Sequence, residues 1–211
     1  MRFPLLPFTP ASRHPNHFAE VIETATTEFL AQCLEGEELT FPTMPAFGSW
    51  VKAVDEDSGN PVYGVVCHAT TSPIDSIHRA RALGLSLAEL REQQPQIFAM
   101  LKTEFRAAIV GFGSEALIYQ HLPPRPPQIH QAVYRCEPDE ILQFTEGLDF
   151  LRTLLQIPAT PVDALIAATI REIYHLRDLD RSWLVQAGRT LSLLLKEDYD
   201  RLRAILNQIH V

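Results

Sequence analysis

The spacing of hydrophobic and polar positions changes near residue 136. Before it, short apolar segments rich in β-branched residues are separated by Gly and Pro, which is typical of strands and turns. After it, apolar residues recur every three or four positions, as on one face of a helix. We therefore expect two domains, a strand-rich domain over residues 1–136 and an α-helical domain over residues 137–211.

Several segments of the first domain have the composition of β-strands. The predicted strands are Gly48–Val54, Val62–Thr71, Thr103–Phe112 and Gln131–Arg135. The turn residues of Asp55–Pro61 predict that the first two strands form a hairpin. The segment Phe18–Leu34 fits a strand or a helix, and its pattern leaves that choice open.

An insert interrupts the predicted strands. Ser86 and Glu89 have the spacing of a capping box, in which each side chain satisfies a free backbone amide at a helix start. This predicts one or two short helices within Asp75–Gln94. The number and spacing of the strands indicate a small barrel or a sandwich, and a barrel is favoured because closure leaves no exposed sheet edge.

The second domain is predicted to contain about three helices. The first is Pro138–Leu155 and the third is Ser182–Ile209. The second is capped by Thr160–Asp163 and continues to Tyr174. On the third helix, Glu197 and Arg201 are spaced for a favourable ion pair. The predicted fold class is α+β: a small N-terminal β-barrel with a helical insert, followed by a C-terminal helical bundle.

Composition and charge exclude several classes of protein. The 211 residues are 46% hydrophobic and 21% charged, as in ordinary soluble domains. The formal net charge of −8 opposes a protein that wraps phosphate backbones. Pro4, Pro7 and Pro10 interrupt the apolar N-terminus, so neither a signal peptide nor a spanning helix is predicted there. We expect a soluble, cytoplasmic protein.

No motif for catalysis, cofactor binding or metal binding is present. The chain lacks GxxxxGK[ST], GxSxG and HExxH, so neither catalytic nor cofactor-binding residues are predicted. Cys33, Cys67 and Cys136 are widely spaced without CxxC, which favours free, buried thiols in a reducing compartment. A zinc site assembled from Cys67, His68 and His78 is a disfavoured alternative. We expect a protein that is not an enzyme.

The most unusual local feature is a proline run, which we treat as a candidate interface. It consists of Pro123, Pro124, Arg125, Pro126 and Pro127. Such a run is either a polyproline ligand for an aromatic groove or a rigid, extended connection. The second reading is favoured, because strand-like segments lie on both sides of it.

The order of these motifs resembles the HAS barrel, the small β-barrel at the N-terminus of HerA-type ATPases and of the rotary ATP synthase α and β subunits. The matching segments are Gly48–Val51, Val62–Val66, Phe105–Gly111, and the proline run before Val133–Tyr134. The resemblance covers about residues 18–136. It implies a stand-alone member, since helices follow where a HerA protein has its ATPase domain. The family's barrels pack side by side in rings, which implies a self-association or docking module.

The sequence is compatible with three functions. The first is a non-enzymatic protein-interaction or assembly module with protein partners, a homo-oligomer that docks to or regulates a barrel-bearing ATPase. The second is an accessory factor in nucleic-acid processing, which the charge balance opposes. The third is an enzyme or small-ligand-binding protein with a pocket between barrel and helices.

Overall fold

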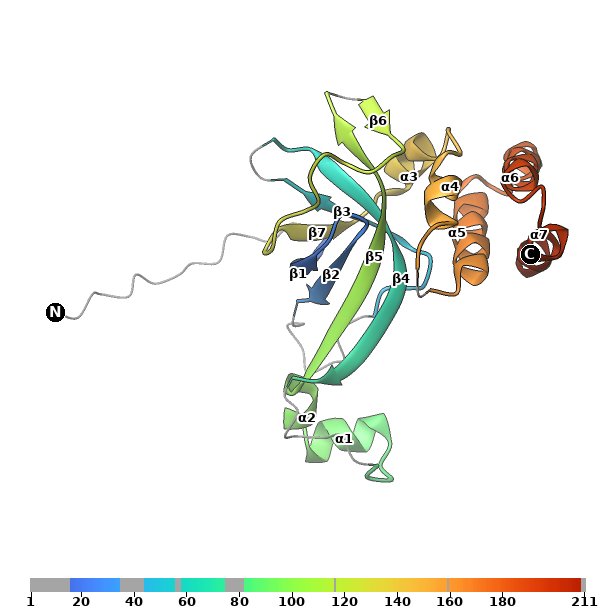
Figure 1. The fold of residues 1–211 in the computed structure, drawn as a ribbon. Helices are drawn as coiled ribbons and strands as arrows, with labels where there is room; N and C mark the ends of the chain where they lie inside the picture. Colours follow the sequence, from blue (N-terminus) through green and yellow to red (C-terminus); the bar gives the residue numbers. More distant parts are fainter. Residues whose placement is uncertain are drawn as a thin grey trace.

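The computed structural model describes residues 16–34, 44–55, 58–74, 82–115, 117–158 and 160–209. A β-barrel lies beside a layer of helices, and a helical insert extends from one end of the barrel (Figure 1). The strands are β1 (His17–Thr24), β2 (Glu28–Cys33), β3 (Trp50–Val54), β4 (Pro61–Pro73), β5 (Leu101–Ser114), β6 (Leu117–Tyr119) and β7 (Ala132–Arg135). The helices are α1 (Leu87–Gln93), α2 (Gln96–Ala99), α3 (Pro138–Phe144), α4 (Phe150–Leu154), α5 (Val162–Leu176), α6 (Arg181–Leu194) and α7 (Tyr199–Gln208).

Six strands form a closed barrel, which confirms the predicted architecture. The hydrogen-bonded order is β2-β1-β7-β3-β4-β5, and β5 pairs again with β2. The segment Phe18–Leu34, left open above, forms the antiparallel strands β1 and β2. The predicted hairpin is β3 paired with β4. Strand β6 pairs with the far end of β5 and lies outside the closed circle.

Side chains on the strands alternate between two hydrophobic cores. One core fills the barrel, and its largest members include Phe29, Phe105 and Ile109. The second core lies between the outer wall of β3, β4 and β5 and the helices, and Trp50 and Tyr63 belong to it. Since adjacent residues of a strand point to opposite faces, these three strands are buried on both sides. The second core therefore contains residues from both sides of the sequence boundary at 136.

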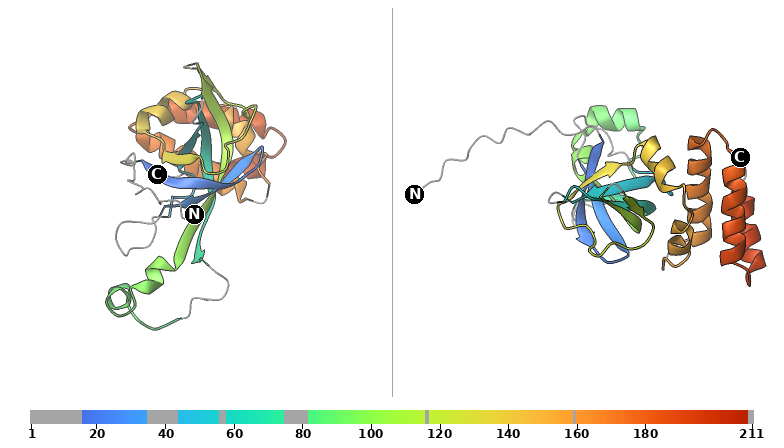
Figure 2. Two further views of the ribbon diagram at one scale, coloured as in Figure 1. Left: turned by 90° about the vertical axis from the view of Figure 1, so that its left-hand side faces the viewer. Right: turned by 90° about the horizontal axis from the view of Figure 1, so that it is seen from above.

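The helices form two layers on that wall of the barrel. Helices α3, α4 and α5 lie next to the strands, and α6 and α7 lie beyond α5 (Figure 2). None of the described helices is long and apolar enough to span a bilayer. The three predicted helical segments are five helices, because the first breaks after Phe144 and the third breaks after Leu194.

The first break is held open by a side chain from outside the helices. Gln120 donates through Nε2 to the carbonyl oxygens of Phe144 and Gly147, the latter at 3.0 Å, and accepts from the amide of Phe150 at 3.0 Å. One amide side chain thus satisfies backbone groups at the end of α3 and at the start of α4. In a continuous helix each of these groups would instead bond to a backbone group four residues away.

The second break changes the partner of Arg201. Asp198 caps α7 by accepting from the amide of Arg201 at 3.0 Å. The Arg201 guanidinium pairs with Asp163 of α5, with 2.6 Å between Nε and Oδ1. The predicted Glu197–Arg201 pair was wrong, because the chain is not helical at Glu197 and Arg201 joins α7 to α5.

The strand-rich domain also differs in detail from the prediction. Strand β5 is longer than expected, and β6 and α2 were not predicted. The expected capping box of Ser86 and Glu89 is present at the start of α1. The rest of the insert prediction falls partly on residues 75–81, which lie outside the described residues.

Gly111 provides a test of the packing between β5, β6 and α3. A Cβ atom at this position would lie 2.3 Å from the carbonyl oxygen of Tyr119 and 2.8 Å from the ring of Phe144. We therefore expect Gly111→Ala to lower the free energy of unfolding by about 2 kcal/mol through overpacking. Urea denaturation monitored by tryptophan fluorescence measures the change.

The matched control is Gly188→Ala in α6. Apart from the backbone of α6 and the two neighbouring residues, no atom of the described residues lies within 4 Å of a Cβ built there. Since alanine has the higher helix propensity, this variant is expected to be more stable by about 0.5–1 kcal/mol. Equal stability of the two variants would contradict the described packing around Gly111.

Candidate functional site

The three cysteines are free thiols, as expected. Cys33 and Cys67 are buried and Cys136 is half-buried. Burial raises the pKa of Cys33 to about 11 and also raises the pKa of Cys67 and of Cys136. Because the thiolate is the reactive form, these thiols are poor nucleophiles at neutral pH.

The alternative zinc site finds no support among its described members. Cys67 points into the core shared with the helices, whereas the neighbouring His68 is exposed on the same strand. His78, the third candidate ligand, lies outside the described residues. Within the described ranges, no group of three or more His, Cys, Asp or Glu side chains is arranged to hold a metal ion.

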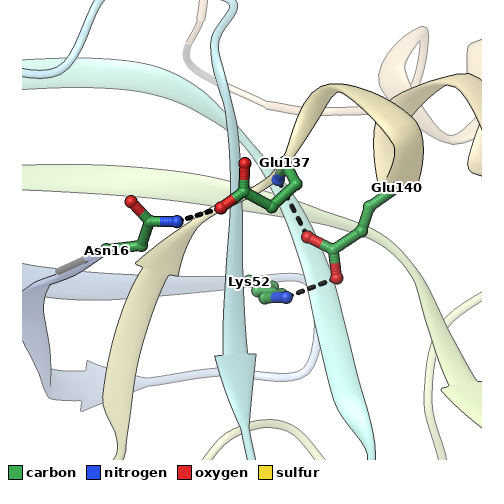
Figure 3. A network of polar contacts seen from close by, with 4 residues as sticks. All are labelled: Asn16, Lys52, Glu137 and Glu140. Carbon is green, nitrogen blue, oxygen red and sulfur yellow. Dashed lines mark hydrogen bonds and ion pairs between the residues drawn. The ribbon is translucent and has the colours of Figure 1, made fainter. Parts of the chain in front are cut away.

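A polar cleft of about 330 Å³ lies where the barrel meets α3. Its charged and polar side chains come from segments far apart in the sequence (Figure 3). Lys52 of β3 pairs with Glu140 of α3, and Asn16 donates to Glu137. The backbone amide of Glu137 donates to the other carboxylate oxygen of Glu140 at 2.8 Å.

These contacts connect the barrel to the start of the helical layer. Arg135, which also lines the cleft, places its guanidinium 4.4 Å from the ring centroid of Phe18. The two glutamates are thus bonded to Lys52 and Asn16, and both cations have partners within the chain. This arrangement favours a structural link over a site built for a ligand.

A second unusual carboxyl group lies on α5. Glu172 is half-buried, and burial raises the pKa of this carboxyl to about 7. Its negative charge contributes to the raised pKa of Cys136, which places the two groups in the same region. Sequence spacing alone gave no signal for Glu172, because it sits among apolar positions of an amphipathic helix.

The proline run lies between β6 and β7. Pro124 and Arg125 are exposed, Pro123 and Pro126 are half-buried, and Pro127 is buried. The described residues form no strand or helix here, and the chain crosses from the terminal strand β6 to β7, which lies between β1 and β3. This path agrees with a connecting segment, while its exposed part leaves the interface prediction untested.

An aromatic cluster that was not predicted from the sequence precedes the proline run. Tyr119 stacks on Phe112 with 5.0 Å between ring centroids, and His121 packs edge-on against both rings. Leu117 on the same strand is 59% exposed. The apolar run Leu117–Tyr119 was the available signal, but three residues are too few for a strand prediction.

These features define a class of protein: a closed, six-stranded β-barrel domain with one wall covered by helices and an exposed strand at one end. A comparison with family models adds to this description. Residues 18–112 match the family model of the HAS barrel domain. The match ends before β7, although β7 closes the barrel between β1 and β3. The comparison with curated proteins found no match.

The link between Lys52 and Glu140 is testable by stability. Both side chains are largely shielded, with 20% and 27% exposed. We expect Lys52→Met to lower the free energy of unfolding by about 1 kcal/mol, because Glu140 loses a partly desolvated partner. Chemical denaturation of the single variants and of Lys52→Met/Glu140→Gln gives the coupling energy. The exposed Lys196→Met is the control, and a zero coupling energy would contradict the link.

Glu172 makes a second prediction, on pH. The folded protein holds the Glu172 proton up to about pH 7, whereas the unfolded chain releases it near 4.5, the ordinary pKa of a glutamate. The folded state therefore binds more protons between these values, and Glu172 lowers stability progressively as pH rises through this window. Above it, the penalty is constant.

We expect Glu172→Gln to be more stable than the parent by about 1–2 kcal/mol at pH 8, a value reduced because the side chain is partly exposed to solvent. At pH 4 the two proteins should have similar stability. Denaturation at both pH values, with the exposed Glu146→Gln as control, measures the difference. A pH-independent difference would show that Glu172 does not titrate in this window.

Proposed function

We propose that this protein is a non-enzymatic protein-interaction module that docks to a barrel-bearing ATPase. Its contact surface is β6 with the exposed part of the proline run, which together we name the β6 surface: Leu117, Tyr119, Leu122, Pro124 and Arg125. The proposal is supported by the HAS barrel domain at residues 18–112, since this barrel type occurs in such ATPases.

The observation that carries the proposal is the position of β6 at the end of the sheet. The strand pairs with β5 on one side, and it is the terminal strand in the described order. A terminal strand presents backbone donors and acceptors to which an extended segment of a partner can add. Leu117, Tyr119 and Leu122 are 59%, 36% and 39% exposed, which adds apolar area to that edge.

The proline run enlarges the β6 surface beyond the strand itself. A stable protein interface buries more than about 1,000 Å² in total, more than a three-residue strand supplies. The proline run extends the surface beyond β6 with a stiff backbone, so little conformational entropy is lost on binding. The packing of Tyr119 against Phe112 and His121 holds β6 on β5.

A second candidate function is the binding of a small polar ligand in the cleft at Lys52. The cleft volume of about 330 Å³ lies at the lower end of ordinary ligand sites. Against this, its glutamates and cations already have partners within the chain. A thermal-shift screen with nucleotides, amino acids and metal ions tests it, and a stabilising compound whose effect is lost in Lys52→Met would favour the ligand-binding function.

The docking proposal is tested by purification with an ATPase from the same organism that carries a HAS barrel. We expect a complex in which chemical crosslinks join the β6 surface to the ATPase barrel. Leu117→Asp should weaken the complex about tenfold, because a charge would be buried at the contact. Quantitative mass spectrometry of the co-purified ATPase measures the loss.

The matched control is Leu193→Asp, since Leu193 is 77% exposed and belongs to α6, a helix that lies away from β6 (Figure 1). Thermal unfolding of both variants shows whether the fold is retained. A complex that is insensitive to Leu117→Asp, or a failure of the ATPase to bind the folded parent, would overturn the proposal.

A further inference from the structure

An arm projects from the barrel and carries an exposed helix. Strand β2 pairs with β5 only from Glu104 onward, so residues 101–103 pair with β4 alone. We name the end of this two-stranded ribbon, together with α1 and α2, the arm (residues 70–74 and 82–104). It extends away from the body of the molecule at the end opposite β6 (Figure 1).

Helix α1 has apolar side chains without a core to cover them. None of its seven residues is buried. Leu87 is 52% exposed, and Leu83 just before the helix is 45% exposed. Isolated helices of this length are marginal in water, so an apolar partner that covers Leu83 and Leu87 would stabilise α1.

The molecule also has an apolar groove of about 380 Å³ between α5, α6 and α7. Ile170 and Tyr174 of α5 line it together with Val185 of α6 and Leu206 of α7. Val185 is 51% and Leu206 40% exposed, so the groove is open to solvent. Gly188 also lines the groove. Outside the backbone of α6 and the two neighbouring residues, no described atom lies within 4 Å of a Cβ built at Gly188, so there is room for another side chain.

The charges on the two surfaces are complementary. Helix α6 contains Arg181 and Arg189 and no acidic residue, and Arg181 lines the groove. Helix α1 carries the exposed Glu89 and Glu92 beside a single Arg91. Helix α1, with its two exposed glutamates, therefore matches an apolar groove that an arginine lines, and a helix in an apolar groove is a common mode of recognition.

We propose that α1 of one copy binds in the α5–α6–α7 groove of a second copy. The arm leaves one end of the barrel, whereas the groove lies in the outer helical layer, and both views separate the two within one copy (Figures 1 and 2). The contact is therefore between molecules. Each contact joins the arm of one copy to the groove of another. Because each copy has one arm and one groove, two copies that exchange their arms form a closed dimer in which both grooves are filled.

Sedimentation of the full chain over a range of micromolar concentrations tests this contact. Leu87→Asp in α1 and Gly188→Met in the groove should each weaken self-association about tenfold. The controls have the same chemistry on other faces: Ala88→Asp in α1 and Gln186→Met in α6. Circular dichroism and thermal unfolding show whether each variant remains folded.

Mixing the two variants gives the decisive result. Leu87→Asp keeps an intact groove and Gly188→Met keeps an intact arm, so the mixture should form one arm–groove contact and associate more strongly than either variant alone. Leu117→Asp should leave self-association unchanged, which separates this contact from ATPase docking. A monomeric parent, an effect equal to that of the controls, or a mixture no stronger than its components would overturn the proposal.

Discussion

The structure depends on aromatic packing between the barrel wall and the helices. Trp50 lies 5.1 Å from Phe144 and 5.5 Å from Phe150 between ring centroids, and Tyr63 lies 5.0 Å from Phe144. Tilted rings at these separations are attractive beyond the area they bury. The indole nitrogen of Trp50 has no hydrogen-bond partner among the described residues, so packing alone holds this ring. Removing the helices would expose these rings, and barrel and helices therefore stabilise each other.

The sequence predicted the strands because each strand needs only a local pattern. Val62–Val66 contains no polar residue because both faces of this strand are buried, each in a different core. The order of the segments was enough to suggest a HAS barrel. The helix breaks depend on distant partners instead. Gln120 hydrogen-bonds to backbone groups between α3 and α4, and Trp183 donates to the carbonyl oxygen of Thr145 at 2.9 Å. A local apolar period carries no information about such donors, so one helix was predicted where two exist.

Of the candidate sites, too, only those marked by a local sequence pattern could be predicted. The proline run was visible because composition alone marks it, whereas its exposed neighbours on β6 occupy too few positions to form a pattern. The network at Lys52 joins Asn16 to Glu137, which are 121 positions apart. Only the pairing of β7 between β1 and β3 brings them together. Predicting this site would have required the strand order, which spacing along the chain does not contain.

Covering one wall of the barrel limits where another protein can bind. The outer side of β3, β4 and β5 is part of the second core, so a partner could reach it only after the helical layer was displaced. That displacement would expose the Trp50 and Phe144 rings and many aliphatic side chains, a cost that few interfaces recover. A protein that binds to this barrel must therefore contact another part of its surface. The terminal strand β6, the arm and the outer helices remain accessible, and each presents apolar side chains to solvent.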